Sequence, residues 1–220
     1  MEKRDLYLSL IEKCRFLPVS LTMDAILGQP RDYGMRRKLR AMTEGLDLKD
    51  FYRATIERIK KKGEEKARLG MAALMWISHS ERLLQLDELL HAMVVEIGST
   101  DLNTENIPSV GTLLSCCLGF LVVPTEALTV CLIHFSLREH LNTFPDIFGP
   151  THSIMAETCL TYLNFQAIKD ILSMLKHAFR GHFVLPQSTP FLEYSSLYWS
   201  IHARREASKD VVSLGLQLFG

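Results

Sequence analysis

Residues 118–141, LGFLVVPTEALTVCLIHFSLREHL, constrain the fold of this chain more than any other segment. Two short apolar runs, the second rich in β-branched residues, flank the polar turn Pro124-Thr125-Glu126, which is the pattern of a β-hairpin. A helix start follows at once. Ser136 and Glu139 have the spacing of a capping box, in which each side chain accepts the backbone N–H of the other residue. The sequence therefore predicts a hairpin that leads directly into a helix, with His134 at the joint between them.

Helical periodicity accounts for much of the remaining chain. Residues 64–78 give the clearest pattern, because small and apolar side chains follow one face while charged side chains occupy the other. An earlier helix is predicted from Asp47, its expected N-cap, with an apolar face that starts at Phe51. It ends with three lysines ahead of Gly63, which is typical of a helix C-terminus. Further helices are predicted over residues 1–14, 21–27, 86–95, 109–117, 152–165, 166–178, 190–203 and 208–219, with loops at 79–82, 98–106 and 181–190.

The order of these elements predicts a fold class. Three helices from residue 64 onward, the hairpin and a further helix follow one another as they do in a winged helix. We therefore expect a mainly α fold in which helical segments flank a winged-helix domain with one small β-hairpin. Its predicted core consists of Met71, Leu74, Trp76 or Ile77, Leu86, Leu89, Met93, Leu113, Leu114, Phe120, Val122, Val130, Leu132 and Leu137.

Composition favours an intracellular globular protein. The 220 residues are 47% hydrophobic, enough for a sizeable core, and a formal net charge of zero creates no global attraction for nucleic acid or an anionic membrane. Five cysteines without CxxC spacing, and an N-terminus without a signal peptide's apolar core, favour a reducing compartment, so we expect the cytoplasm. The apolar run at 110–123 is shorter than the roughly 20 residues of a membrane span, and it is predicted to be a buried helix followed by a buried strand.

No pattern in the sequence predicts an active site or a metal site. Residues 134–140 contain two histidines and a glutamate, but their spacing differs from the HExxH and HxxEH of zinc enzymes. Cys116 and Cys117 point about 100° apart on a helix, so they are predicted to be buried rather than to chelate a metal. Ser80 and Ser136 lie outside any GxSxG elbow, and no GxxxxGK[ST] loop occurs. We therefore expect a protein that is not an enzyme.

DNA binding is the main competing function, because many winged helices bind DNA. A DNA reader needs Arg, Lys, Asn or Gln on its third helix, yet residues 109–117 contain none of these. The hairpin tip, Thr125-Glu126-Ala127, is acidic where a phosphate contact requires a cation. The basic clusters at 36–40 and 60–62 are accounted for by a solvated helix face and a helix C-terminus. No nucleic-acid or membrane partner is therefore expected.

Five segments together resemble a known family. They are MTEGLDLKDFYRATIERI, ARLGMAALMWISHSERLLQLDELLHAM, LIHFSLREHL, AETCLTYLNF and PFLEYSSLYW. They resemble the region that follows the NACHT nucleotide-binding core in fungal NACHT–ankyrin repeat proteins, a winged helix of the GPI inositol-deacylase type. The resemblance implies three domains: residues 1–63 as the C-terminal end of a NACHT module, 64–165 as the winged-helix domain, and 166–220 as a helical extension that leads into ankyrin repeats.

The resemblance implies a regulatory role. In these relatives a P-loop NTPase precedes the region and ankyrin repeats follow it, so this sequence is expected to be a fragment of a larger STAND-type signalling protein. The implied function is a non-enzymatic regulatory and interaction module that helps hold the nucleotide-bound off state, with ADP or ATP bound only through an associated NACHT core. Its partners would be that core and the ankyrin repeats. A DNA-binding winged-helix protein and a free-standing interaction adaptor remain open as alternatives.

The C-terminal helices have an expected role in self-association. The predicted helices at 190–203 and 208–219 have little to cover them within the chain, and Leu197, Tyr198 and Trp199 give the first of them a broad apolar face. Uncovered apolar patches of this kind usually find partners. Together with the predicted N-terminal helices, this face is therefore expected to make the isolated chain associate or be poorly soluble.

The resemblance also assigns a role to His134. In NACHT proteins with a winged helix, a histidine in a pattern like [FI]-x-H-x-[ST]-[FL]-x-E contacts the phosphate of bound ADP. Residues 133–139, IHFSLRE, are similar but not identical to this pattern. An imidazole beside a helix N-terminus can donate to a diphosphate, and the helix dipole adds positive potential there. The alternative is that His134 only caps or packs the joint between strand and helix.

Overall fold

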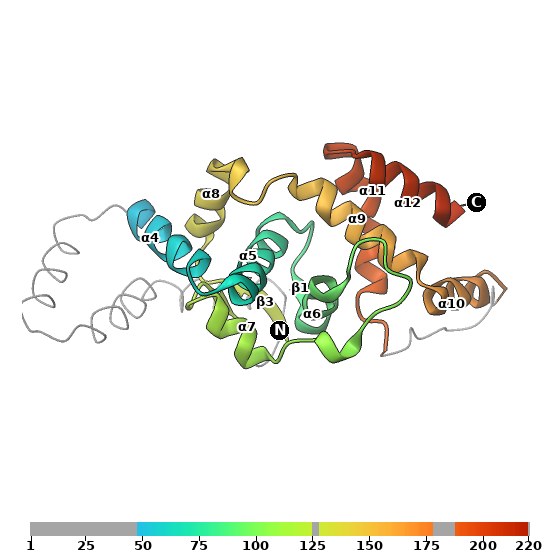
Figure 1. The fold of residues 1–220 in the computed structure, drawn as a ribbon, viewed down its shortest axis with the longest axis horizontal. Coiled ribbons are helices and arrows are strands. Elements are labelled where there is room, and N and C mark those ends of the chain that lie inside the picture. Colours follow the sequence, from blue (N-terminus) through green and yellow to red (C-terminus); the bar gives the residue numbers. More distant parts are fainter. Residues whose placement is uncertain (1–47, 125–127, 178–187, 220) are drawn as a thin grey trace, which may run out of the picture.

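The computed structural model describes residues 48–124, 128–177 and 188–219 of the chain. These residues are mainly helical with one small sheet, as the sequence predicts (Figure 1). The elements are α4 (Leu48–Lys60), α5 (Glu64–His79), β1 (Leu84–Gln85), α6 (Leu86–Val94), the 3-10 helix η1 (Thr104–Asn106), α7 (Val110–Cys116), β2 (Leu121–Val122), β3 (Thr129–Leu132), α8 (Phe135–Thr143), the 3-10 helix η2 (Pro145–Ile147), α9 (Thr151–Asn164), α10 (Gln166–His177), α11 (Leu192–Arg205) and α12 (Lys209–Phe219).

Several expectations lie outside the described residues. They concern the two N-terminal helices, the basic cluster at 36–40, the Asp47 cap, the hairpin tip and most of the loop at 181–190. The division into three domains stays a prediction as well. The remaining predicted helices all occur, with boundaries within about two residues of those expected, which is the usual fraying at helix ends.

The hairpin forms as predicted, and a third strand joins it. β2 and β3 pair antiparallel with Leu121 opposite Leu132, and β1 pairs with the other edge of β3 with Leu84 opposite Val130. The strand order is therefore β1-β3-β2. β1 was missed, because a strand of two residues has no periodicity to read. The hairpin thus connects through β1 to the start of α6.

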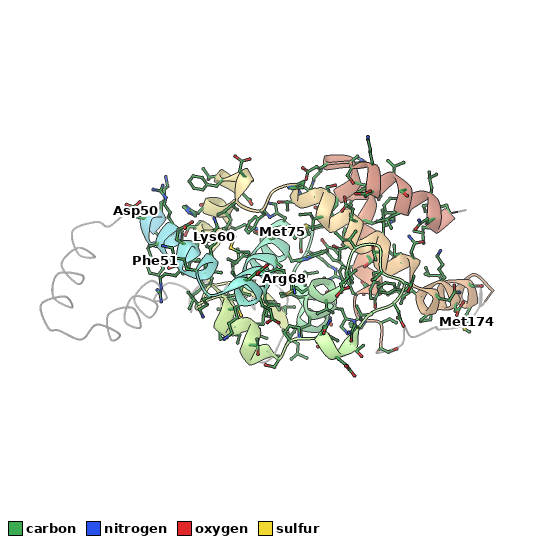
Figure 2. All side chains as sticks on the ribbon, viewed as in Figure 1. Asp50, Phe51, Lys60, Arg68, Met75 and Met174 are labelled. Carbon is green, nitrogen blue, oxygen red and sulfur yellow. The ribbon has the colours of Figure 1, made fainter. Side chains whose placement is uncertain are left out.

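Helix α5 lies at the centre of the body, where Figure 2 labels Met75. Its second half is buried on every side, from Ala73 to Ser78, because α4, α6, α7, β3 and α9 all pack around it. Gly70 permits the close approach of α7. A Cβ atom at this position would lie 2.9 Å from the carbonyl oxygen of Cys116 and 2.9 Å from Cγ2 of Ile59. The sequence predicted that one face of residues 64–78 is buried, whereas in the second half of the helix all faces are buried.

The predicted core is confirmed in part. Leu74, Trp76, Ile77, Leu89, Met93, Leu113, Phe120, Val130 and Leu137 are buried, whereas Met71, Leu86, Leu114, Val122 and Leu132 are only half-buried and pack against the core from outside. The core also extends further than predicted, since it runs without interruption from Tyr52 on α4 to Tyr194 on α11.

The prediction that the last two helices lack cover is wrong for their inner faces. Helix α9 supports both of them (Figure 1). On α11, Tyr194 packs into the main core, and on α12, Val211 and Leu214 pack with Ala156 and Leu160 of α9. Their outer faces do expose large apolar side chains, namely Leu197, Val212, Leu216 and Phe219.

Two further expectations concern the apolar run at 110–123. It forms α7 followed by β2, and Cys116 and Cys117 are both buried, as predicted. Across the ranges that the structure describes, no helix combines the length and the apolar character needed to cross a membrane.

Helix α10 extends away from the body, with Met174 exposed near its far end (Figure 2).

Candidate functional site

The candidate site is the joint between β3 and α8, where His134 is the N-cap of the helix. The backbone of His134 is extended, with φ −154° and ψ 147°, and its ring nitrogen Nδ1 accepts the backbone N–H of Ser136 at 3.2 Å. The capping box predicted for Ser136 and Glu139 is therefore wrong. Because the helix begins at Phe135, Ser136 already lies inside the first turn, and the imidazole takes the place of the serine hydroxyl as the cap.

The hydroxyl of Ser136 belongs instead to a short polar chain. Ser136 Oγ lies 2.6 Å from His134 Nδ1 and 2.9 Å from the hydroxyl of Tyr52, which comes from α4. Tyr52 is buried, and this burial raises the pKa of its phenol, while the bond to Ser136 acts in the opposite direction. Tyr52 thus anchors the joint to α4, a role that sequence spacing cannot reveal because 84 residues separate the two hydroxyl groups.

This cap fixes the tautomer of His134. A backbone N–H can only donate, so Nδ1 must present its lone pair to Ser136. The neutral ring therefore carries its proton on Nε2. Among the described residues, Nε2 has no hydrogen-bond partner. The imidazole is half-buried, and its Nε2–H remains a donor for a group outside this joint.

The surroundings of the ring favour an anion. His134 lies at the N-terminus of α8, where the helix dipole produces positive potential. The ring of Phe135 lies beside the imidazole, with centroids 4.4 Å apart and the planes tilted by 36°, and Phe135 is 68% exposed. An N–H donor at a helix N-terminus beside an uncovered aromatic ring suits a ligand that combines anionic oxygens with an apolar surface.

The joint lacks the features of a hydrolase among the residues described. Ser136 has an imidazole within reach, but the same Nδ1 is occupied by the backbone N–H that caps the helix. No described carboxylate bonds to the ring to orient it as a general base. Ser80, the other serine considered, is buried, and its hydroxyl donates to the carbonyl of Trp76.

The described residues contain no group of three or more His, Cys, Asp or Glu side chains that could hold a metal ion. The carboxylate of Glu139, between the two histidines of residues 134–140, is exposed, whereas His140 is buried against Tyr52. These two side chains therefore lie in different environments.

In comparisons with known proteins, no family model, curated protein or solved structure matches this chain.

Proposed function

We propose that the chain is a non-enzymatic regulatory and interaction module of a NACHT-type signalling NTPase, built on a winged helix. Within this module, His134 helps to hold the nucleotide-bound off state by donating a hydrogen bond to a phosphate of ADP. The nucleotide itself is held by a NACHT core, and the module works in the cytoplasm. Its further partners are the ankyrin repeats of the larger protein.

The arrangement of elements supports the winged-helix part of the proposal. From α5 to β3 the order is helix, strand, helix, helix, strand, strand, and the hairpin passes directly into α8. The strand order β1-β3-β2 ties the hairpin to the helices that precede it, so the unit is a single packed body rather than a hairpin on a linker. This order agrees with the resemblance of the five sequence segments.

The single observation that carries the function is the fixed tautomer of His134. The helix cap uses Nδ1 and leaves Nε2–H as a donor at the positive end of α8. A hydrogen bond to a charged phosphate is worth about 1.5–3 kcal/mol. A ligand that makes this bond only in the closed arrangement shifts the population towards that arrangement by the difference in affinity.

The surface of α7 argues against the DNA-binding alternative. In a winged helix that reads DNA, this third helix enters the major groove and carries polar side chains that reach base edges. The exposed residues of α7 are Gly111, Thr112 and Ser115, none of which is basic. The nearby cation, Lys62, donates from Nζ to the carbonyl of Ser115 at 2.6 Å. The observations therefore favour a protein partner over a nucleic acid.

The test joins this chain to a matching NACHT core and measures how long ADP is retained. His134→Asn is the informative variant, because asparagine is a strong N-cap but lacks the Nε2–H donor. We expect His134→Asn to fold normally and to release ADP about tenfold to a hundredfold faster, the factor that corresponds to one charge-assisted hydrogen bond.

His134→Ala serves as the comparison. It should release ADP as fast as His134→Asn and should also lower the thermal midpoint, since alanine removes the cap as well. Equal ADP retention in the parent and in His134→Asn would show that His134 is only a structural cap. A chain that folds stably and has no affinity for a NACHT core would instead favour the free-standing adaptor, which the exposed apolar residues of α12 also suit.

A further inference from the structure

A second group of histidines lies where three helices meet. We call His79, His152 and His202 the histidine cluster. His79 ends α5, His152 lies in the first turn of α9, and His202 lies near the end of α11. The rings of His152 and His202 stack with centroids 5.2 Å apart, and the ring of His79 meets that of His152 edge to face at 5.7 Å.

The hydrogen bonds within the cluster exclude a state in which His152 and His202 are both protonated. Nδ1 of His152 lies 2.9 Å from Nδ1 of His202, so one ring must donate and the other must accept, and two imidazolium rings would place N–H against N–H. Nε2 of His202 bonds to the hydroxyl of Tyr194 at 2.9 Å. His79 Nδ1 lies 3.2 Å from the carbonyl of Met75, to which it can only donate.

The charges that face the cluster also disfavour protonation. Arg138 of α8 donates to the carbonyl of Ser78 at 2.8 Å, and Arg205 of α11 pairs with Glu81 of the loop after α5. Glu206 is the remaining carboxylate, and its Oε2 accepts the backbone N–H groups of His152 and Ser153 at 2.9 and 3.2 Å. Two guanidinium groups thus oppose an added positive charge, while both carboxylates are already engaged.

Burial is the main cause of the altered acidity of all three rings. It lowers the pKa of His202 to about 3, with His152, Arg205 and His79 adding to the effect. Burial also lowers the pKa of His79 and that of His152. For His152, Arg205 acts in the same direction, and Glu206 and Glu81 partly offset it.

The cluster lies at the attachment of α11 to the body. Next to it, the hydroxyl of Tyr194 accepts the backbone N–H of Glu81 at 3.2 Å. The rings of Phe191 and Tyr194 pack against the indole of Trp76 at centroid distances of 5.5 and 6.0 Å. Arg82 adds a third contact, since its guanidinium lies 5.4 Å from the centre of the Tyr194 ring. Detaching α11 would therefore expose the histidines and Trp76 together.

We propose that the histidine cluster is a pH-sensitive latch, which holds α11 and α12 on α5 and α9 at neutral pH and releases them in mild acid. The sign follows from linkage. Once α11 detaches, each exposed histidine regains a pKa near 6.5 and binds a proton that the closed cluster excludes. The closed state is therefore fully favoured above about pH 6.5 and loses stability as the pH falls towards the low pKa of the buried rings. This proposal does not depend on the function proposed above.

The test is hydrogen exchange of the full chain, followed by mass spectrometry at pH 7.5 and 5.5 and corrected for the intrinsic exchange rate. Protection factors of α11 and α12 report the opening equilibrium directly. We expect them to fall about tenfold for His202 alone between these pH values, and further for each other ring of the cluster that titrates. Peptides from α7, which contains no histidine, should keep their protection, and this separates release of the latch from general acid unfolding.

Two substitutions and one control complete the test. His152→Asn and His202→Gln replace a ring nitrogen with an amide group that does not titrate, and each should reduce the acid-induced loss of protection in α11. His91→Gln is the matched control, because His91 is a half-buried histidine of α6 outside the cluster, and this variant should keep the full loss. If His202→Gln fails to fold, the parent and His152→Asn still decide. Protection of α11 that does not change with pH, an equal loss in His152→Asn, or an equal loss in α7 would overturn the proposal.

Discussion

The sharpest prediction concerns two glycines that receive the same substitution with opposite results. Gly70 lies inside α5 and Gly215 inside α12, so alanine at either position gains about 0.5–1 kcal/mol of helix stability from propensity alone. At Gly215 the new methyl group meets nothing within 4 Å, and this gain should appear in full. Gly215→Ala is therefore expected to raise the free energy of unfolding.

At Gly70 the same methyl group would overlap with its neighbours. It would lie 2.9 Å from the backbone carbonyl oxygen of Cys116 and 2.9 Å from Cγ2 of the buried Ile59. Neither atom can move far, because one belongs to the backbone of α7 and the other to a β-branched side chain that is stiff at χ1. Overpacking of this kind costs about 1–3 kcal/mol, so the propensity gain is cancelled or exceeded.

Urea denaturation of the two variants and the parent provides the measurement. The two variants should differ by about 1–3 kcal/mol in free energy of unfolding, with unchanged m-values, and Gly70→Ala should be the less stable. If Gly70→Ala stabilises the chain as much as Gly215→Ala does, α5 and α7 do not approach each other as described, and the reasoning is refuted.

The remaining predictions concern packing, capping and association. Leu74 is 0% exposed, so Leu74→Ala should cost about 2–5 kcal/mol in the same assay, and an unchanged midpoint would contradict its burial. Arg138 donates to three carbonyls at the end of α5, so Arg138→Ala should cost about 1–2 kcal/mol in free energy of unfolding. Arg138→Lys should restore less than half of this stability, and full rescue by lysine would argue against the three guanidinium bonds. Light scattering should show concentration-dependent association of the chain, reduced in the double variant Leu216→Lys/Phe219→Lys, and a clean monomer of the parent at high concentration would count against it.

Local signals predicted the elements whose information is local. The hairpin that leads into α8 and the long helix α5 were both predicted, because turn residues, apolar runs and helical spacing lie within a few residues of one another. The cap was predicted only in part, because the capping box at Ser136 is wrong, whereas the alternative in which His134 caps the joint is observed. Ser136 and Glu139 have the correct spacing for a capping box. The hydroxyl of Ser136 instead forms hydrogen bonds with the ring of His134 and with the hydroxyl of Tyr52 on α4. A distant residue thus decides between two caps that are both locally acceptable.

The histidine cluster could not be predicted because its members are far apart in sequence. His152 and His202 are separated by 50 residues, and His79 lies further away on another helix. None of the three has a neighbouring ligand-like residue at a recognisable spacing. The packing of α11 on α9, with Tyr194 against Trp76 of α5, brings them together, and the sequence prediction left α11 uncovered.

The burial of Trp76 limits how this chain can be divided and recombined during evolution. Its indole is 2% exposed because Phe191 and Tyr194, which belong to the C-terminal segment, close over it. A gene fusion that kept residues 64–165 and exchanged the C-terminal segment would leave this indole exposed, unless the incoming segment supplied an equivalent pair of rings. Recombination that preserves the fold must therefore carry α11 together with α5, and the two should be inherited as one unit.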